Sequence, residues 1–124
     1  MYITIMAFDN LHGSKPLVLD AIVKLRKDPE NKHDSEAIAC EMRYFGKIGY
    51  LANSTRTVVR GTMSAGRLYD KISEEYFSRI KFVIGNTAIA EVLSTEELTK
   101  EMANQDSDIH YLCDDLSKLE LKEE

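Results

Sequence analysis

The stretch YFSRIKFVIGNTAIAEVL, residues 76–93, carries the clearest local signal in the sequence. Its two halves, YFSRIKFVI and TAIAEVL, are rich in β-branched and aromatic residues, which favour extended strands. Gly85 and Asn86 separate the halves, and a two-residue loop that begins with glycine is typical of a type II′ hairpin. The stretch therefore predicts two antiparallel strands joined by a tight turn.

Several segments upstream of this hairpin also have strand character. They are rich in Ile, Val, Leu and aromatic residues, or they alternate polar and apolar residues, and they cover residues 2–8, 16–26, 37–44, 47–51 and 68–72. In the third segment the alternation predicts one buried face, formed by Ile38, Cys40, Met42 and Tyr44. The polar stretch DPENKHDSE, residues 28–36, is expected to be a loop that faces water.

Helical signals are few and lie mostly after the hairpin. A short helix is predicted over 55–60, capped by Asn53 or Ser54, with Val58 and Val59 inward and two arginines outward. It is followed by an irregular small-residue loop over 61–66. Ser94 with a glutamate three residues later makes a capping box that opens a helix over 95–103. A last helix is expected over 108–119, where one apolar stripe combines Ile109, Leu112, Cys113, Leu116 and Leu119.

Length and composition fit one small domain. The chain has 124 residues, of which 44% are hydrophobic, so an ordinary core can stabilise it without metals or disulfides. The pattern predicts a mostly β fold: a small antiparallel OB-like or SH3-like barrel over residues 1–93, with an inserted short helix. Residues 94–124 are expected to form an acidic helical extension outside the barrel.

The net charge of −5 is distributed unevenly. Residues 1–93 hold 13 Lys and Arg against 11 Asp and Glu, whereas residues 94–124 hold 3 against 10. Three roles remain open for this acidic tail: a solvated surface, a shield that folds over a basic face and competes with nucleic acid, or a docking element. Its apolar stripe is expected to pack on the barrel, or else to serve self-association or a protein partner.

Several classes of function find no support in the residue pattern. Cys40 and Cys113 lack CxxC spacing and are expected to be reduced thiols. His12, His33 and His110 are isolated from one another, so no metal site is predicted. No nucleophile, base or carboxylate pair has a known catalytic spacing, so we expect neither an enzyme nor a cofactor. No apolar stretch approaches the length of a membrane helix, so we expect a cytoplasmic protein without membrane partners.

Basic and aromatic residues alternate in the middle of the chain. Arg43, Tyr44 and Phe45 are followed by more of the same kinds, namely Lys47, Tyr50, Arg56, Arg60 and Arg67. Such interleaving suits a groove for single-stranded nucleic acid, because cations track phosphates while flat rings stack on bases. The alternative is an ordinary strand pair whose rings lie in the core. His33 and Asp34 in the polar loop either pair with each other to shape that loop or contact a ligand.

Two motifs resemble a known family. The run DPENKHDSEAIAC, residues 28–40, resembles the signature of HIRAN domains, in which a DPxNxxD-x-x-AI segment leads from a loop into a strand. FGKIGYLAN, residues 45–53, is similar to the strand that comes next in that family. The similarity extends over about residues 2–93, and VVRGTMSAGRLYDKI, residues 58–72, resembles the short stand-alone bacterial members.

This resemblance implies an OB-like barrel with a pocket that captures the 3′ end of single-stranded DNA. His33 and Asp34 then stand where the family has an aromatic residue and an Asp that hold the terminal nucleotide and its sugar hydroxyl. Tyr50 falls on a pocket position, and Asn53 falls where a phosphate-contacting cation is common. The first loop departs from the family, because Asp9, Asn10, Leu11 and His12 replace an Arg and two stacking rings.

The leading hypothesis from the sequence is a non-enzymatic module that binds single-stranded nucleic acid. The cleft would be formed by His33, Asp34, Tyr50 and Asn53, and phosphates would be met by Lys47, Arg56 and Arg60. The alternative is a protein-interaction or regulatory module, in which the barrel is a scaffold and the tail stripe docks a partner or a second copy.

Overall fold

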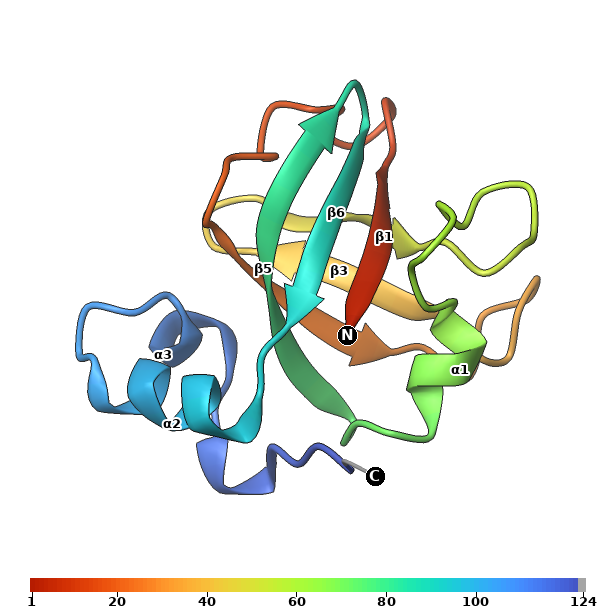
Figure 1. The fold of residues 1–124 in the computed structure, drawn as a ribbon. Helices are drawn as coiled ribbons and strands as arrows, with labels where there is room; N and C mark the ends of the chain where they lie inside the picture. Colours follow the sequence, from red (N-terminus) through yellow and green to blue (C-terminus); the bar gives the residue numbers. More distant parts are fainter. Residues whose placement is uncertain (123–124) are drawn as a thin grey trace.

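The computed structural model describes residues 1–122, which form a barrel with a helical extension (Figure 1). Its six strands are β1 (Tyr2–Ala7), β2 (Ile22–Lys27), β3 (Ile38–Met42), β4 (Gly46–Leu51), β5 (Glu75–Ile84) and β6 (Thr87–Val92). They close in the order β1-β4-β3-β2-β5-β6, and β6 pairs back onto β1. All six pairings are antiparallel, so the predicted mostly β, antiparallel barrel is confirmed.

The hairpin at residues 76–93 forms as the sequence predicts. Ile84 pairs with Thr87 across the turn, which leaves Gly85 and Asn86 as the two loop residues. Gly85 has a φ of 58°, a left-handed value that only glycine adopts without steric cost. Inside the barrel the strands bury a fully covered apolar core, which includes Ile3, Ile5, Leu25, Ile38, Ile48, Phe77 and Ile80.

The contact between β1 and β4 depends on a glycine. A Cβ atom on Gly49 would lie 1.9 Å from the carbonyl oxygen of Met6, so no other residue fits without moving one of the strands. The close approach also joins the ends of the two strands, because the Phe8 amide donates to the Ile48 carbonyl at 3.1 Å. Gly49 therefore brings together two strand ends that are distant in the sequence.

Two of the predicted strands are shorter than expected. The segment 16–26 contributes only its last residues to β2, because residues 16–21 form turns in which Asp20 has a φ of 67°. The segment 37–44 ends as a strand at Met42. Tyr44 lies in the following turn with a φ of 74° and is 87% exposed, so its predicted place on the buried face is wrong.

The predicted helix and strand between residues 55 and 72 are also wrong. Residues 55–60 form turns rather than a helix, and Val59 is 42% exposed instead of buried. The helix lies later, as α1 (Ala65–Tyr69), where a strand over 68–72 was expected. Ser64 caps it by accepting a hydrogen bond from the Arg67 amide. Five residues are too few to separate the period of a strand from that of a helix.

The acidic tail begins as predicted and then departs from the prediction. The helix α2 (Thr95–Ala103) has the expected capping box, formed by Ser94 and Glu97. The predicted helix over 108–119 is instead α3 (Ile109–Leu112), an extended link and the 3₁₀ turn η1 (Leu116–Lys118). Contact with the barrel replaces helix formation here, because the apolar residues of the stripe all reach the hydrophobic core or its margin.

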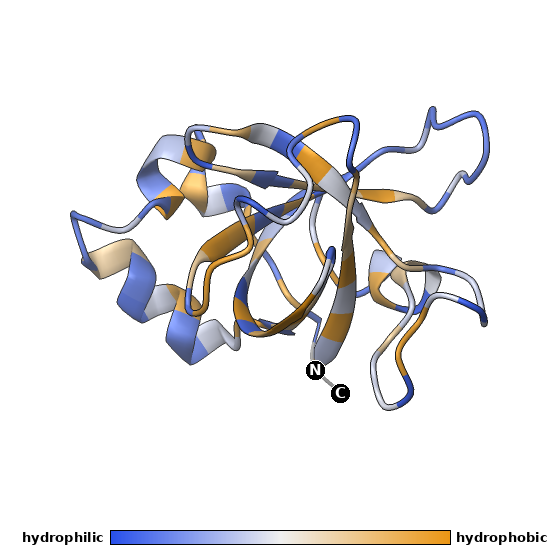
Figure 2. Ribbon diagram, turned by 90° about the horizontal axis from the view of Figure 1, so that it is seen from above, coloured by the Kyte–Doolittle hydropathy of each residue, from blue (hydrophilic) through white to orange (hydrophobic). Residues whose placement is uncertain are grey.

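The tail packs on one side of the barrel and pairs with several of its cations. Asp108 binds Arg43 at 3.2 Å, and Glu101 binds Arg79 at 2.9 Å. Lys24 donates to the carbonyl of Leu112 at 2.8 Å. Figures 1 and 2, viewed at right angles, both place α2 and α3 on the left of the barrel and α1 with its preceding loop on the right.

None of the helices formed by residues 1–122 is long and apolar enough to span a lipid bilayer.

Candidate functional site

A hollow of about 490 Å³ opens between β1, β4 and the loops that follow β2 and β4. We call it the His33 pocket; its lining consists of Met6, Phe8, His33, Asp34, Tyr50, Leu51, Ala52, Asn53, Ser54 and Thr57. The four residues that the sequence assigned to a cleft, His33, Asp34, Tyr50 and Asn53, are all among them. The floor is apolar, and Asp34 is the one carboxylate in this lining.

The outer wall of the His33 pocket contains a ring that the sequence analysis did not assign to it. Phe8 follows β1 and lies beside Tyr50, with ring centroids 5.8 Å apart and planes inclined by 34°. The two meet because Met6 pairs with Tyr50 across β1 and β4. Strand alternation from the buried Ile3 and Ile5 already indicates that Phe8 faces outward, but its neighbour becomes known only from the pairing.

Tyr50 is held by polar contacts on both sides. Its hydroxyl donates to a carboxylate oxygen of Asp28 at 2.9 Å, and the Lys47 ammonium lies 3.1 Å from the hydroxyl oxygen and 5.0 Å from the ring centroid. In a regular strand, residues 47 and 50 would face opposite sides. The pairing of β3 and β4 shifts between Cys40 and Glu41, and this bulge places Lys47 beside Tyr50.

A chain of hydrogen bonds fixes the inner wall. Asn31 Oδ1 accepts the amides of His33 and Asp34 at 2.9 and 3.1 Å. Asp34 Oδ1 accepts the Glu36 amide, as in an Asx turn, and Asp34 Oδ2 accepts Asn53 Nδ2 at 2.6 Å. Each carboxylate oxygen can accept two hydrogen bonds, so Asp34 keeps capacity to accept a ligand hydroxyl.

Asn53 is a structural link in this wall. Its Nδ2 donates to Asp34, and its Oδ1 accepts the Gly66 amide at 2.7 Å. The side chain therefore joins the loop after β2 to the start of α1, and it is not positioned as a free phosphate donor. His33 differs, because its exposed ring has no hydrogen-bond partner among the residues that the structure describes and can stack on a planar ligand.

Two of the three predicted phosphate contacts, Arg56 and Arg60, lie along the loop after Asn53, whereas Lys47 lies on β4 beside Tyr50. Arg56 is exposed on the turn beside Ser54 and Thr57, and Arg60 is exposed further along. Within residues 1–122, neither guanidinium has a carboxylate within ion-pair distance. Three other arginines, Arg26, Arg43 and Arg79, are paired with acids.

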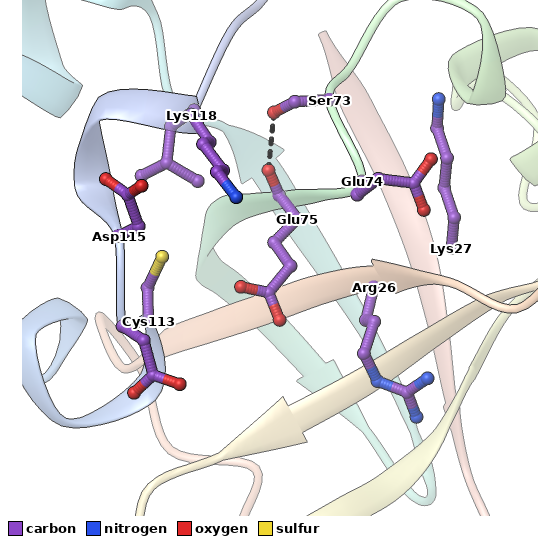
Figure 3. Close-up of a pocket in the computed structure, with 10 residues that line it drawn as sticks. Arg26, Lys27, Ser73, Glu74, Glu75, Cys113, Asp115 and Lys118 are labelled. Carbon is purple, nitrogen blue, oxygen red and sulfur yellow. Dashed lines mark hydrogen bonds between the residues drawn. The ribbon is translucent and has the colours of Figure 1, made fainter.

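A second hollow of about 600 Å³ lies where the tail meets the barrel (Figure 3). Figure 3 shows Cys113, Asp115 and Lys118 on the tail wall, with Arg26 and Glu75 on the barrel strands. Two of its charged groups are engaged in ion pairs: Glu75 binds Lys24 at 3.0 Å and Arg26 binds Glu41 at 2.7 Å. This hollow is part of the interface between the tail and the barrel.

Neither cysteine lines the His33 pocket. Cys40 and Cys113 are free thiols, and burial raises the pKa of both. A protonated buried thiol is a poor nucleophile. Among residues 1–122, no three side chains of the His, Cys, Asp and Glu types lie close enough together to hold a metal ion.

Comparison with known proteins found no match to this chain among models of protein families, characterised proteins or solved structures.

Proposed function

We propose that this protein is a non-enzymatic module that binds single-stranded nucleic acid, with a terminal nucleotide in the His33 pocket. The rings of Phe8, Tyr50 and His33 supply flat surfaces for a base. Asp34 supplies an acceptor for a sugar hydroxyl. The resemblance of residues 28–53 to the HIRAN signature supports the same proposal, including capture of a 3′ end.

One observation carries the proposal furthest: the segment 42–69 contains five Lys and Arg residues and no Asp or Glu. We call it the acid-free segment. It supplies six residues of the lining of the His33 pocket, from Tyr50 to Ser54 and Thr57. Lys47 lies beside Tyr50, and Arg56 is exposed on the adjoining turn. A ligand on this side of the barrel meets cations without nearby acids from the same segment, which suits a polyanion.

The position of the tail supports the same assignment. No residue of 94–122 lines the His33 pocket, so the tail does not cover it. The tail carboxylates pair with Arg43 and Arg79 instead. The alternative of a docking module would need another surface, because the apolar stripe packs against the barrel.

The test is fluorescence anisotropy with a labelled thymidine dodecamer. With two or three phosphates neutralised, log K is expected to fall with log[salt] at a slope of about −1.5 to −2. Phe8→Ala is expected to weaken binding about 5- to 150-fold through loss of one base stack, and the double variant His33→Ala with Asp34→Ala is expected to weaken it as well. Tyr111→Ala is the matched control, because that ring is 62% exposed on the tail side. Equal affinities for all these proteins would exclude the His33 pocket.

End recognition needs a second comparison. If Asp34 accepts a 3′ hydroxyl, an oligomer that ends in a 3′ phosphate should bind more weakly, because the carboxylate repels it. Asp34→Asn is expected to reduce this difference. Equal binding of both oligomers by the unaltered protein would mean that the pocket takes internal nucleotides.

A further inference from the structure

Two aromatic side chains lie on the outer surface at the far end of the loop formed by residues 53–62. Phe82 is 64% exposed and Tyr2 is 44% exposed. With Val59 and Ile89 they line a shallow hollow of about 280 Å³. We call these four residues the Phe82 patch. Contiguous exposed apolar side chains of this kind mark interaction sites.

A strand irregularity turns Phe82 outward. Regular alternation from the buried Ile80 would direct Phe82 into the barrel. The pairing of β5 with β6 shifts here instead, because Ile80 pairs with Ala90 and Phe82 pairs with Ile89. The extra residue, Lys81, makes a bulge, and bulges re-aim side chains next to functional sites. The fold thus exposes a ring that a regular strand would bury.

The Phe82 patch is continuous with the His33 pocket. A third hollow, of about 440 Å³, lies between the 53–62 loop and α1 and shares Asn53 and Ser54 with the His33 pocket. At its other end it shares four residues with the hollow at the Phe82 patch, namely Val59, Arg60, Gly61 and Thr62. The three hollows therefore form one track along the loop.

The middle of this track is positively charged. Arg60 and Arg67 line the third hollow and are both exposed. In the part of the chain that the structure describes, neither forms an ion pair. Both belong to the acid-free segment. Two ring platforms with unpaired arginines between them match the alternation of bases and phosphates in a single strand.

We propose that a single strand whose end occupies the His33 pocket continues over Arg60 and Arg67, and that Phe82 and Tyr2 form a second base-stacking platform. This inference rests on the function proposed above. It extends the site from a terminal nucleotide to a strand of several nucleotides, within the range of about 4–16 that single OB-type barrels cover. Charge complementarity with the acid-free segment and continuity with the pocket favour this occupant over a protein.

The test compares strand lengths by anisotropy, with a thymidine trimer and a thymidine dodecamer. The trimer is expected to reach only the His33 pocket, whereas the dodecamer spans the track. Phe82→Ala is therefore expected to weaken the dodecamer about 5- to 150-fold and to leave the trimer unchanged. Phe8→Ala is expected to weaken both. Phe82→Tyr keeps a ring and should keep dodecamer affinity, which separates stacking from a folding defect.

Salt dependence tests the arginines independently. Changing Arg60 and Arg67 together to Gln is expected to make the dodecamer's salt slope shallower by about 1.4, or 0.7 for each phosphate contact. The matched control changes Lys100 and Lys118 to Gln, since both lie exposed on the tail. An unchanged slope in the arginine variant would overturn the track.

The remaining outcomes distinguish the two proposals. If both oligomers bind alike and Phe82→Ala changes neither, the track is wrong while the His33 pocket stands. If neither oligomer binds, both proposals fail. If Phe82→Ala leaves affinity unchanged but abolishes a dimer seen by sedimentation, the Phe82 patch is a surface for self-association and the track is again wrong.

Discussion

Lys24 joins the tail to the barrel, and replacing it with Met should loosen that junction. Its ammonium lies 3.0 Å from a Glu75 oxygen, 3.2 Å from a Glu41 oxygen and 2.8 Å from the Leu112 carbonyl oxygen. The Lys24 side chain is only 11% exposed. Lys24→Met keeps the apolar stem but removes the charge and all three of these polar contacts.

The expected loss follows from what remains after the substitution. Glu41 keeps Arg26 at 2.7 Å, so its carboxylate stays paired. Glu75 loses its cation, but its side chain is 32% exposed and water can replace part of the interaction. The Leu112 carbonyl loses its donor. The Lys24 network is intermediate between an exposed ion pair and a fully buried one. We therefore expect the substitution to lower the free energy of unfolding by about 2–3 kcal/mol.

The assay is urea unfolding at pH 7, followed by far-ultraviolet circular dichroism. Lys100→Met is the matched control, because Lys100 lies 3.6 Å from Glu96 and both side chains are more than 70% exposed, at 75% and 82%. That pair should contribute less than about 0.5 kcal/mol. Equal unfolding midpoints for the two variants would refute the reasoning, since the buried network would then contribute no more than a surface pair.

The pH dependence of this difference has a definite sign. Burial alone would lower the pKa of Lys24, but hydrogen bonds to Glu75 and Glu41 outweigh it and raise the pKa above 10.5. The stabilisation is thus fully present below the unfolded value and is lost only as the pH rises through the raised pKa. The difference in free energy of unfolding between the unaltered protein and Lys24→Met should therefore be constant from pH 6 to about pH 9.

Three further predictions concern other parts of the fold. Ser94→Ala removes the cap of α2 and should lower the free energy of unfolding by about 1 kcal/mol in urea titrations. The Ser94 amide holds the pKa of Glu97 below 4.5, so the stabilisation contributed by the Glu97 carboxylate should vanish as the pH falls through that lowered pKa. Glu97→Gln should therefore make the free energy of unfolding depend less on pH in the acid range. Gly49→Ala forces a Cβ against the Met6 carbonyl and should destabilise the protein by more than about 3 kcal/mol, measured as a shift in the thermal midpoint.

The sequence alone determined the features that depend on neighbouring residues. The turn at Gly85 and the capping box at Ser94 are local, because a left-handed φ or a cap requires only residues a few positions apart. The alternation over residues 37–44 likewise identified Ile38, Cys40 and Met42 as buried, although Tyr44 at its end is exposed. The polar loop with His33 and Asp34 and the strand with Tyr50 could be assigned to one candidate site through their resemblance to a family motif.

Tertiary structure alone decided the features that depend on pairing between distant segments. Strand alternation turns Phe8 outward, but only the register of β1 on β4 places it beside Tyr50. The exposure of Phe82 depends on a bulge in the pairing of β5 with β6, and no local sequence pattern predicts that bulge. The residues of 108–119 have helical spacing, yet burial of Ile109 and Cys113 against the barrel outweighs the weak preference of a short helix. Contacts between distant segments have no local signature, and they determine which rings and cations meet.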